Sequence, residues 1–364
     1  MIRVLCDAIH ADLWESLRLL FEVRLGMELY RPIGMEWQEA GLWRFEQGQP
    51  YGLGVAHQFL DQWHDDEPVG GYATPPSIHT AWTERRDTTH PGQVQRLVTM
   101  SQARELGFDL VLCTLAENEY GFRAFADELG AHYGIQVGNQ GADNKWGAAE
   151  FALLSVTTPG FTPWKPHVYY RQEFDLELFA PDRGAGAEPD LVMNRVQCTS
   201  QTGGHYDRFL ELSALLAGVA RLRWYGHCEP RDDLWGGDDP TTPAVAASMH
   251  RARVAYHPKM WSDGYGHVIH NWFSIGRPVL ATAGYYEDKL AGPLFVEGVT
   301  SFDLQRMSTL ETATTITRLI RDDELWLRMS DASAARFREV VNFDAEAEQI
   351  RAMLDNVLSD RLAR

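Results

Sequence analysis

The chain has 364 residues, of which 45% are hydrophobic and 11% aromatic, and its formal net charge is −18. A chain of this length usually forms two hydrophobic cores rather than one, so we expect two domains. The acidic balance repels phosphate polymers and argues against non-specific nucleic-acid binding. No apolar run reaches the length of a membrane span, and the first residues lack the basic and apolar regions of a signal peptide. We therefore expect a cytoplasmic protein without membrane insertion.

Strand and helix signals alternate in the first half of the chain. Residues 2–9 predict a strand, and from Asp12 the apolar spacing predicts a helix that stops near Gly26. The elements expected after these are a long loop over 65–92, a helix over 94–106, a strand over 108–115, a helix over 119–129 and a strand over 134–139. Repeated strand, helix and strand order predicts a mostly parallel sheet covered on both faces.

The second half repeats this alternation after a Gly- and Pro-rich stretch, 181–190, which predicts a linker. The elements expected there are strands over 191–198, 220–228, 253–258 and 277–282, and helices over 206–216 and 243–251. From Thr309 onward the pattern is helical, without a strand signal. The predicted fold class is α/β, with two Rossmann-like domains facing across a cleft and a helical C-terminal extension. The predicted domains are residues 1–180 and 190–335, and the helices over 336–364 could cross back to the first domain.

Polar residues gather at 262–280, in front of an apolar helix signal. The strand expected at 253–258 runs into this stretch. In open α/β sheets, ligands bind beyond the carboxyl ends of the strands, where helix N-termini present free N–H groups. A helix is expected to start near Tyr265, and Gly264 and Gly266 let its backbone approach a ligand closely.

These residues follow one another in a recognisable order: Asp263, Tyr265-Gly266, Asn271, Gly276, Pro278 and Val279. In this order the chain resembles the nucleotide-sugar glycosyltransferases of the GT-B fold. Their second domain carries a glutamate, a Phe-Gly or Tyr-Gly, a second glutamate eight positions after the first, and then Gly-x-Pro before a strand. The resemblance, specific over 191–296, implies that Asp263 meets donor-sugar hydroxyls and that Asn271 replaces the residue holding the nucleotide ribose. An amide still hydrogen-bonds ribose hydroxyls, without the assistance of a charge.

The resemblance also implies that basic side chains and a helix N-terminus, rather than a metal, neutralise the leaving diphosphate. Arg195 matches the family's Arg at the end of the domain's first strand, and Lys259 substitutes for a Lys that the chain lacks. The expected donor-binding residues are thus Arg195, Lys259, Gly264, Tyr265, Gly266, His267 and Asn271. We expect no metal and no cofactor, only a nucleotide-sugar co-substrate such as a UDP- or GDP-sugar.

The acceptor hydroxyl needs a base, for which His10 at the end of the first strand is the candidate, with Asp12 fixing its tautomer. The expected catalytic residues are therefore His10, Asp12 and Asp263, with Glu117, Glu119 and His227 as secondary candidates. Structural interpretations compete: His10 as a strand-end histidine, Asp263 as a helix N-cap, and Arg195 and Lys259 as surface ion-pair partners. His267 and His270 form too weak a pattern for a metal pair, and the widely spaced cysteines predict buried, reduced thiols.

Three functions remain open from the sequence. The leading one is metal-independent glycosyl transfer from a nucleotide sugar to an acceptor hydroxyl. The alternatives are a sugar-nucleotide epimerase or hydrolase of the same fold, and a non-catalytic nucleotide-sugar or glycan binding module. Residues 10–37 resemble glycosyltransferase-like proteins of tailed bacteriophages. This resemblance implies as acceptor a hydroxymethylated base in phage DNA or a surface glycan, and implies the host cytoplasm as location.

Overall fold

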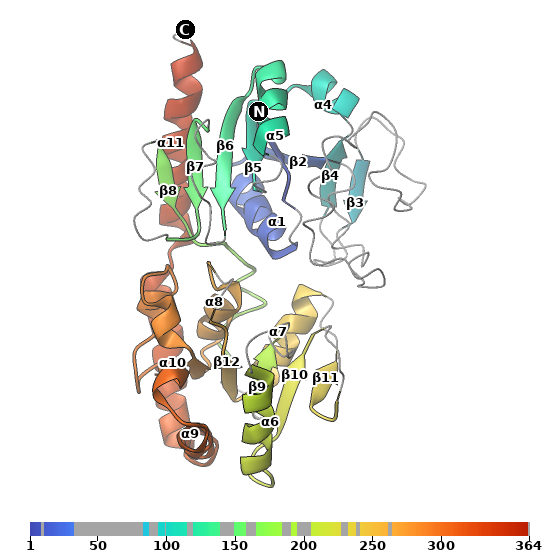
Figure 1. Ribbon diagram of the computed structural model, residues 1–364. Helices are drawn as coiled ribbons and strands as arrows, with labels where there is room; N and C mark the ends of the chain where they lie inside the picture. Colours follow the sequence, from blue (N-terminus) through green and yellow to red (C-terminus); the bar gives the residue numbers. More distant parts are fainter. Residues whose placement is uncertain are drawn as a thin grey trace. The chain divides into compact units, whose positions relative to one another are not determined.

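The computed structural model describes residues 1–8, 11–32, 83–86, 94–98, 100–114, 119–138, 149–157, 165–183, 191–194, 205–226, 232–237, 241–260 and 264–362. The chain forms two compact units, Met1–Phe174 with Phe343–Arg364, and Asp175–Asn342 (Figure 1). Each unit contains a parallel sheet with helices packed on it, so the predicted pair of Rossmann-like domains is confirmed. No helix in the described ranges is both long and apolar enough to cross a membrane.

The first unit is built on an eight-stranded sheet of order β3-β4-β2-β1-β5-β6-β7-β8. The strands are β1 (Arg3–Cys6), β2 (Glu28–Pro32), β3 (Thr83–Arg86), β4 (Val94–Val98), β5 (Leu110–Cys113), β6 (His132–Val137), β7 (Phe151–Leu154) and β8 (His167–Tyr169). All neighbours pair in parallel except β3 with β4. The chain adds strands on one side of β1 and then on the other, so the topological switch point lies between β1 and β5.

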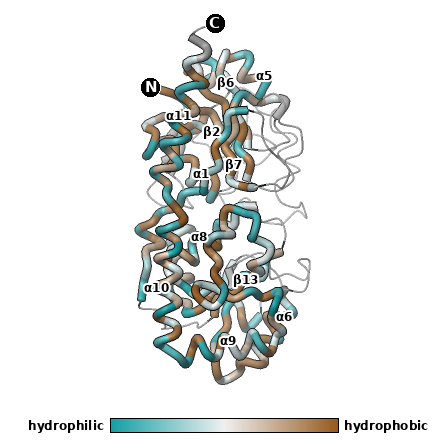
Figure 2. Tube along the Cα trace, turned by 90° about the vertical axis from the view of Figure 1, so that its left-hand side faces the viewer, coloured by the Kyte–Doolittle hydropathy of each residue, from teal (hydrophilic) through white to brown (hydrophobic). Residues whose placement is uncertain are grey.

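Helices cover both faces of this sheet. The described helices are α1 (Ala11–Arg18), its π-helical continuation η1 (Leu19–Arg24), α4 (Met100–Leu106), α5 (Glu119–Leu129) and α11 (Phe343–Leu362). One core contains residues of α1 and α11, and the other contains residues of α4 and α5. Figure 2 shows hydrophobic residues concentrated on the strands, as this two-faced burial requires.

The helix expected over 94–106 is wrong in its first half. Residues Val94–Val98 form strand β4, which pairs in parallel with β2 and antiparallel with β3, and only Met100–Leu106 is helical. Leu97 and Val98 are fully buried. A short apolar run fits a strand or a helix equally well, and here pairing with β2 and β3 makes it a strand.

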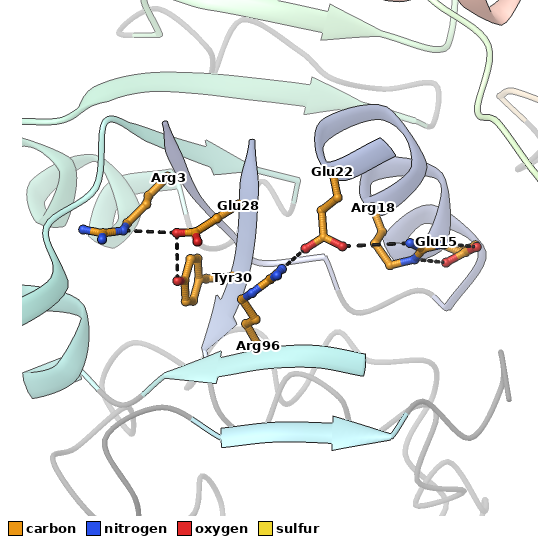
Figure 3. Close-up of polar contacts among 7 residues, drawn as sticks. All are labelled: Arg3, Glu15, Arg18, Glu22, Glu28, Tyr30 and Arg96. Atoms are coloured by element: carbon orange, nitrogen blue, oxygen red, sulfur yellow. Dashed lines mark hydrogen bonds and ion pairs between the residues drawn. The ribbon is translucent and has the colours of Figure 1, made fainter. Parts of the chain in front are cut away.

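Ion pairs also hold β4 in place, as Figure 3 shows. The guanidinium of Arg96 binds the carboxylate of Glu22, which lies 3.9 Å from Arg18. Arg18 in turn makes a two-pronged contact with Glu15, at 2.7 and 2.9 Å. Burial raises the pKa of Glu22 above its ordinary value, and the two arginines oppose that rise. The π-helical segment that carries Glu22 is therefore linked to a strand more than seventy residues away.

The C-terminal helix α11 packs in the first unit, along β7 and β8 (Figure 1). Glu346 accepts a hydrogen bond of 2.6 Å from the backbone N–H of Arg171 and a second from its guanidinium. Arg24 binds Glu173 and Asp344 together. The expected C-terminal boundary lay at residue 336, whereas the units divide after Asn342.

Glu346→Gln is expected to change how the free energy of unfolding depends on pH. Burial raises the pKa of Glu346 above its ordinary value of 4.5, against the opposing effect of Arg171. The native state therefore keeps a proton that the unfolded chain has lost. The stability from this group is complete below about pH 4.5 and is lost as pH rises through the folded-state pKa.

Urea denaturation of both proteins from about pH 4 to about pH 7 measures this effect. The stability of the wild type relative to Glu346→Gln should fall with rising pH. The exposed Glu348 of the same helix provides the control, Glu348→Gln, for which no such trend is expected. A relative stability that rises with pH contradicts the assignment.

The second unit has a six-stranded parallel sheet of order β11-β10-β9-β12-β13-β14. The strands are β9 (Leu191–Asn194), β10 (Leu222–Tyr225), β11 (Trp235–Gly237), β12 (Val254–His257), β13 (Val279–Ala281) and β14 (Ser301–Asp303). The helices are α6 (His205–Leu215), α7 (Thr242–Arg251), α8 (His267–Ser274), α9 (Thr309–Arg321) and α10 (Asp323–Val340), with short 3-10 turns η6 (Ala283–Tyr286), η7 (Gly292–Leu294) and η8 (Leu304–Arg306). The strand order places the switch point between β9 and β12.

Residues just ahead of the expected linker, 181–190, already pack on the second unit. The hydroxyl of Ser274 donates to the carbonyl of Phe179 at 2.8 Å. The guanidinium of Arg277 donates to the carbonyl of Asp182 at 2.5 Å. The change of unit therefore falls at 174/175, a few residues before the stretch whose composition predicted it.

Candidate functional site

The described part of the polar stretch begins at Gly264, between the carboxyl end of β12 and helix α8, beside the switch point of the second unit. His257 ends β12, and half-buried Lys259 follows it. The hydroxyl of Thr282, directly after β13, donates to the carbonyl of Lys259. This contact joins the two loops at the edge of the sheet where ligands bind in open α/β folds.

Helix α8 begins at this edge. Its N-cap is Gly266, at φ 77°, and no side chain of the described residues forms the cap hydrogen bond. The first backbone N–H groups of a helix have no acceptor within it, and they carry the positive end of the helix dipole. This end of α8 is therefore suited to an anion such as a phosphate. The N-cap position is thus Gly266, whereas Asp263 lies outside the described residues.

Two features of position 266 favour glycine: its positive φ and the close approach of a neighbouring ring. A positive φ is unfavourable for residues with a Cβ. A Cβ at this position would also lie 3.1 Å from the ring of Tyr286. The hydroxyl of Tyr286 is in turn 3.1 Å from Nε2 of His257, at the end of β12. The start of α8 is thus packed directly against the edge of the sheet.

The ring of Tyr265 is buried against His270 rather than directed to solvent. Tyr265 is 3% exposed, and the two rings stack with their centroids 4.3 Å apart and their planes at 11°. Nδ1 of His270 lies 2.9 Å from the carbonyl oxygen of Gly266. The turn before α8 therefore offers a ligand its backbone groups more than its side chains.

Asn271 lies one helical turn into α8. It is 3% exposed, and its side-chain oxygen has no hydrogen-bond partner among the described residues. Helical side chains lean toward the N-terminus, so this amide lies beside the turn that begins at half-buried His267. A buried polar atom without a partner is costly and indicates a bound group that supplies one.

The other expected site residues are only partly described. His10, Glu117, Arg195, His227 and Asp263 lie outside the described residues. Asp12 is in the first turn of α1 and Glu119 begins α5, both in the first unit. Within the ranges that the structure describes, no three His, Cys, Asp or Glu residues gather closely enough to hold a metal ion. Cys6 and Cys113 are buried thiols, and Cys113 donates to the carboxylate of Asp7 at 3.5 Å.

Sequence reasoning missed two buried carboxylates at strand ends. Asp303, which ends β14, accepts hydrogen bonds from the backbone N–H groups of Ala283 and Gln305 at 3.1 and 3.0 Å. Asp7, directly after β1, accepts one from the backbone N–H of Thr114. Both are fixed by bonds to neighbouring loops. An aspartate at the end of an apolar strand was the available signal.

The comparisons with known proteins agree with this architecture. No protein-family model matches the sequence, and no curated protein matches it. Sucrose-phosphate synthase (tll1590) from Thermosynechococcus elongatus superposes with a TM-score of 0.63 at 11% identity, over 99% of this chain and 100% of that one. Anabaena HepE, in complex with UDP and glucose, gives 0.62 at 12% identity, over 98% and 99%.

The fold is that of the GT-B glycosyltransferases. At such low identities, the likeness extends to the fold alone. The expected fold class is therefore confirmed, and the chemistry has to be argued from the residues of the site.

Proposed function

We propose that this chain transfers a sugar from a nucleotide-sugar donor to an acceptor hydroxyl. The observation that carries the proposal is the buried side-chain oxygen of Asn271, which has no partner among the described residues and lies near the N-terminus of α8. A nucleoside diphosphate fits both features, because its phosphates are anionic and its ribose hydroxyls are donors. The solved structure of Anabaena HepE with UDP and glucose, which has a similar fold, supports this choice of donor.

The donor's parts are assigned to different groups at this edge of the sheet. The first N–H groups of α8, with Lys259 and Arg195, neutralise the diphosphate that leaves. Asn271 hydrogen-bonds the ribose, and Asp263 holds hydroxyls of the transferred sugar. In this arrangement protein groups stabilise the leaving diphosphate without a metal.

The acceptor side is assigned to the first unit. His10 accepts the proton of the acceptor hydroxyl, and Asp12 orients its imidazole. Glu117 and Glu119 are the secondary candidates for the base in this unit, and His227 is a secondary candidate in the second unit. The acceptor oxygen forms a bond to the anomeric carbon as the bond from that carbon to the diphosphate breaks, and the diphosphate leaves with the electron pair. The proposed acceptor is a hydroxymethylated base of phage DNA or a surface glycan.

Calorimetric titration with UDP and GDP tests the donor site. Asn271→Leu is expected to weaken nucleoside-diphosphate binding about tenfold, the effect of losing one hydrogen bond of about 1.4 kcal/mol. Ser274→Ala is the matched control, because Ser274 is equally buried at the other end of α8 and bonds the carbonyl of Phe179. Equal weakening by the two variants would remove Asn271 from the site.

A panel of nucleotide sugars, incubated with and without acceptors, separates transfer from its alternatives. Mass spectrometry of glucosylated or otherwise modified acceptor is the expected positive result. Consumption of donor without any acceptor would indicate the epimerase or hydrolase. Binding of nucleotide sugar without turnover would indicate the binding module.

A further inference from the structure

We propose that His270 is a positioning residue, which holds the turn Gly264–Gly266 in the shape that receives the donor diphosphate. The inference rests on the proposed function of this site. His270 itself is fully buried within α8. It therefore acts on the ligand through the backbone of the turn.

Two donors of His270 converge on one acceptor. The backbone N–H of His270 donates to the carbonyl oxygen of Gly266 at 3.1 Å, and ring atom Nδ1 lies 2.9 Å from the same oxygen. A carbonyl oxygen only accepts hydrogen bonds, so Nδ1 carries a proton. The side-chain bond adds to the ordinary helical one and fixes the direction of the Gly266 carbonyl.

The same imidazole also holds the residue before Gly266. Its ring stacks on that of Tyr265 at 4.3 Å between centroids. On another side of the turn, the ring of Tyr286 would lie 3.1 Å from a Cβ on Gly266, closer than an ordinary contact. Tyr286 is itself bonded to His257 at the end of β12. The turn is thus held by a stack, a hydrogen bond and a close packing contact.

The fixed carbonyl has a direct consequence for the ligand site. The peptide unit is planar and trans, so its N–H points opposite to its C=O. Because the carbonyl of Gly266 points into α8 toward His270, the N–H of His267 points out of the helix N-terminus. A donor aimed before the ligand arrives lowers the entropic cost of binding an anion. This donor should therefore strengthen the binding of the phosphate groups rather than that of the nucleoside.

Two variants of His270 separate its contacts. His270→Phe keeps a ring to stack on Tyr265 but loses the bond to Gly266. His270→Asn loses the stack, but its amide nitrogen occupies nearly the same place as Nδ1. Both variants are titrated with UDP and with uridine. In His270→Phe, UDP binding should weaken about tenfold, whereas uridine binding should change less than about twofold. In His270→Asn, UDP binding should be largely restored. Equal losses for UDP and uridine, or unchanged UDP binding in His270→Phe, overturn the inference.

A second measurement does not depend on the ligand. NMR relaxation of the backbone amides should give the N–H of His267 an order parameter of about 0.85 in the wild type and a markedly lower one in His270→Phe. An unchanged value in the variant overturns the positioning role. The two proposals can also fail separately. If the wild type binds no nucleoside diphosphate but the order parameter still falls in His270→Phe, only the proposed function is overturned.

Discussion

Replacing Arg277 with Met is expected to lower the free energy of unfolding of the second unit by about 4 kcal/mol. Arg277 is fully buried, and its guanidinium donates to the carbonyls of Ala252, Asp182, Ile275 and His250 at 2.5 to 3.1 Å. Burial lowers its pKa to about 10, which reflects the scarcity of water around it. Methionine fills similar space but leaves four carbonyl acceptors without this donor, two of them in buried hydrogen bonds.

Chemical denaturation, followed through hydrogen exchange of β12 and β13, measures this loss. Arg277→Lys should be intermediate, because an ammonium reaches fewer of the carbonyls than a guanidinium does. Arg306→Met is the control, since Arg306 is 77% exposed and its ion pair with Asp303 spans 3.3 Å. A loss no larger than that of the control would show that apolar packing, rather than these hydrogen bonds, holds the segment around Asp182.

Asp263→Asn is expected to reduce kcat/KM for glycosyl transfer by about a hundredfold or more, with the free energy of unfolding changed by less than about 0.5 kcal/mol. The proposed function assigns this carboxylate to hydroxyls of the transferred sugar, where its charge strengthens the bonds. The substitution leaves Gly266, the N-cap residue of α8, unchanged.

Steady-state kinetics and thermal denaturation of the same preparations give the two quantities. Asp331→Asn provides a control on an exposed aspartate, whose partner Arg183 lies 2.8 Å away at the surface. His10→Ala should likewise abolish transfer with little change in stability. If activity and stability fall in parallel in these variants, the residues are structural and the catalytic assignment fails.

Strong local patterns predicted the elements that depend on them. The helix expected over 119–129 is α5 with the same limits, and the all-helical region after Thr309 is α9, α10 and α11. The sequence also placed the polar stretch at the end of β12 and ahead of a buried helix. Period, turn residues and capping groups act over a few neighbours, so one window of sequence contains them.

The sequence predicted the position of the polar stretch between β12 and α8, but not the contacts that its residues make. The sequence pointed to Gly264, Tyr265 and Gly266 as backbone that approaches a ligand. It did not reveal that Tyr265 stacks on His270, or that Tyr286 packs against Gly266. Tyr286 lies twenty positions further along the chain, beyond any local pattern.

By itself, then, the sequence determined the α/β class, the order of its strongest helices and strands, and a polar stretch at a strand end. Only the tertiary structure decided that Val94–Val98 is a strand, that Arg277 donates to four carbonyls, and that α11 packs in the first unit. The three-residue strands β8, β11 and β14 were not predicted, because they lack an apolar run such as the one that predicted β13. These features depend on partners far away in the chain, and only the folded chain brings those partners together.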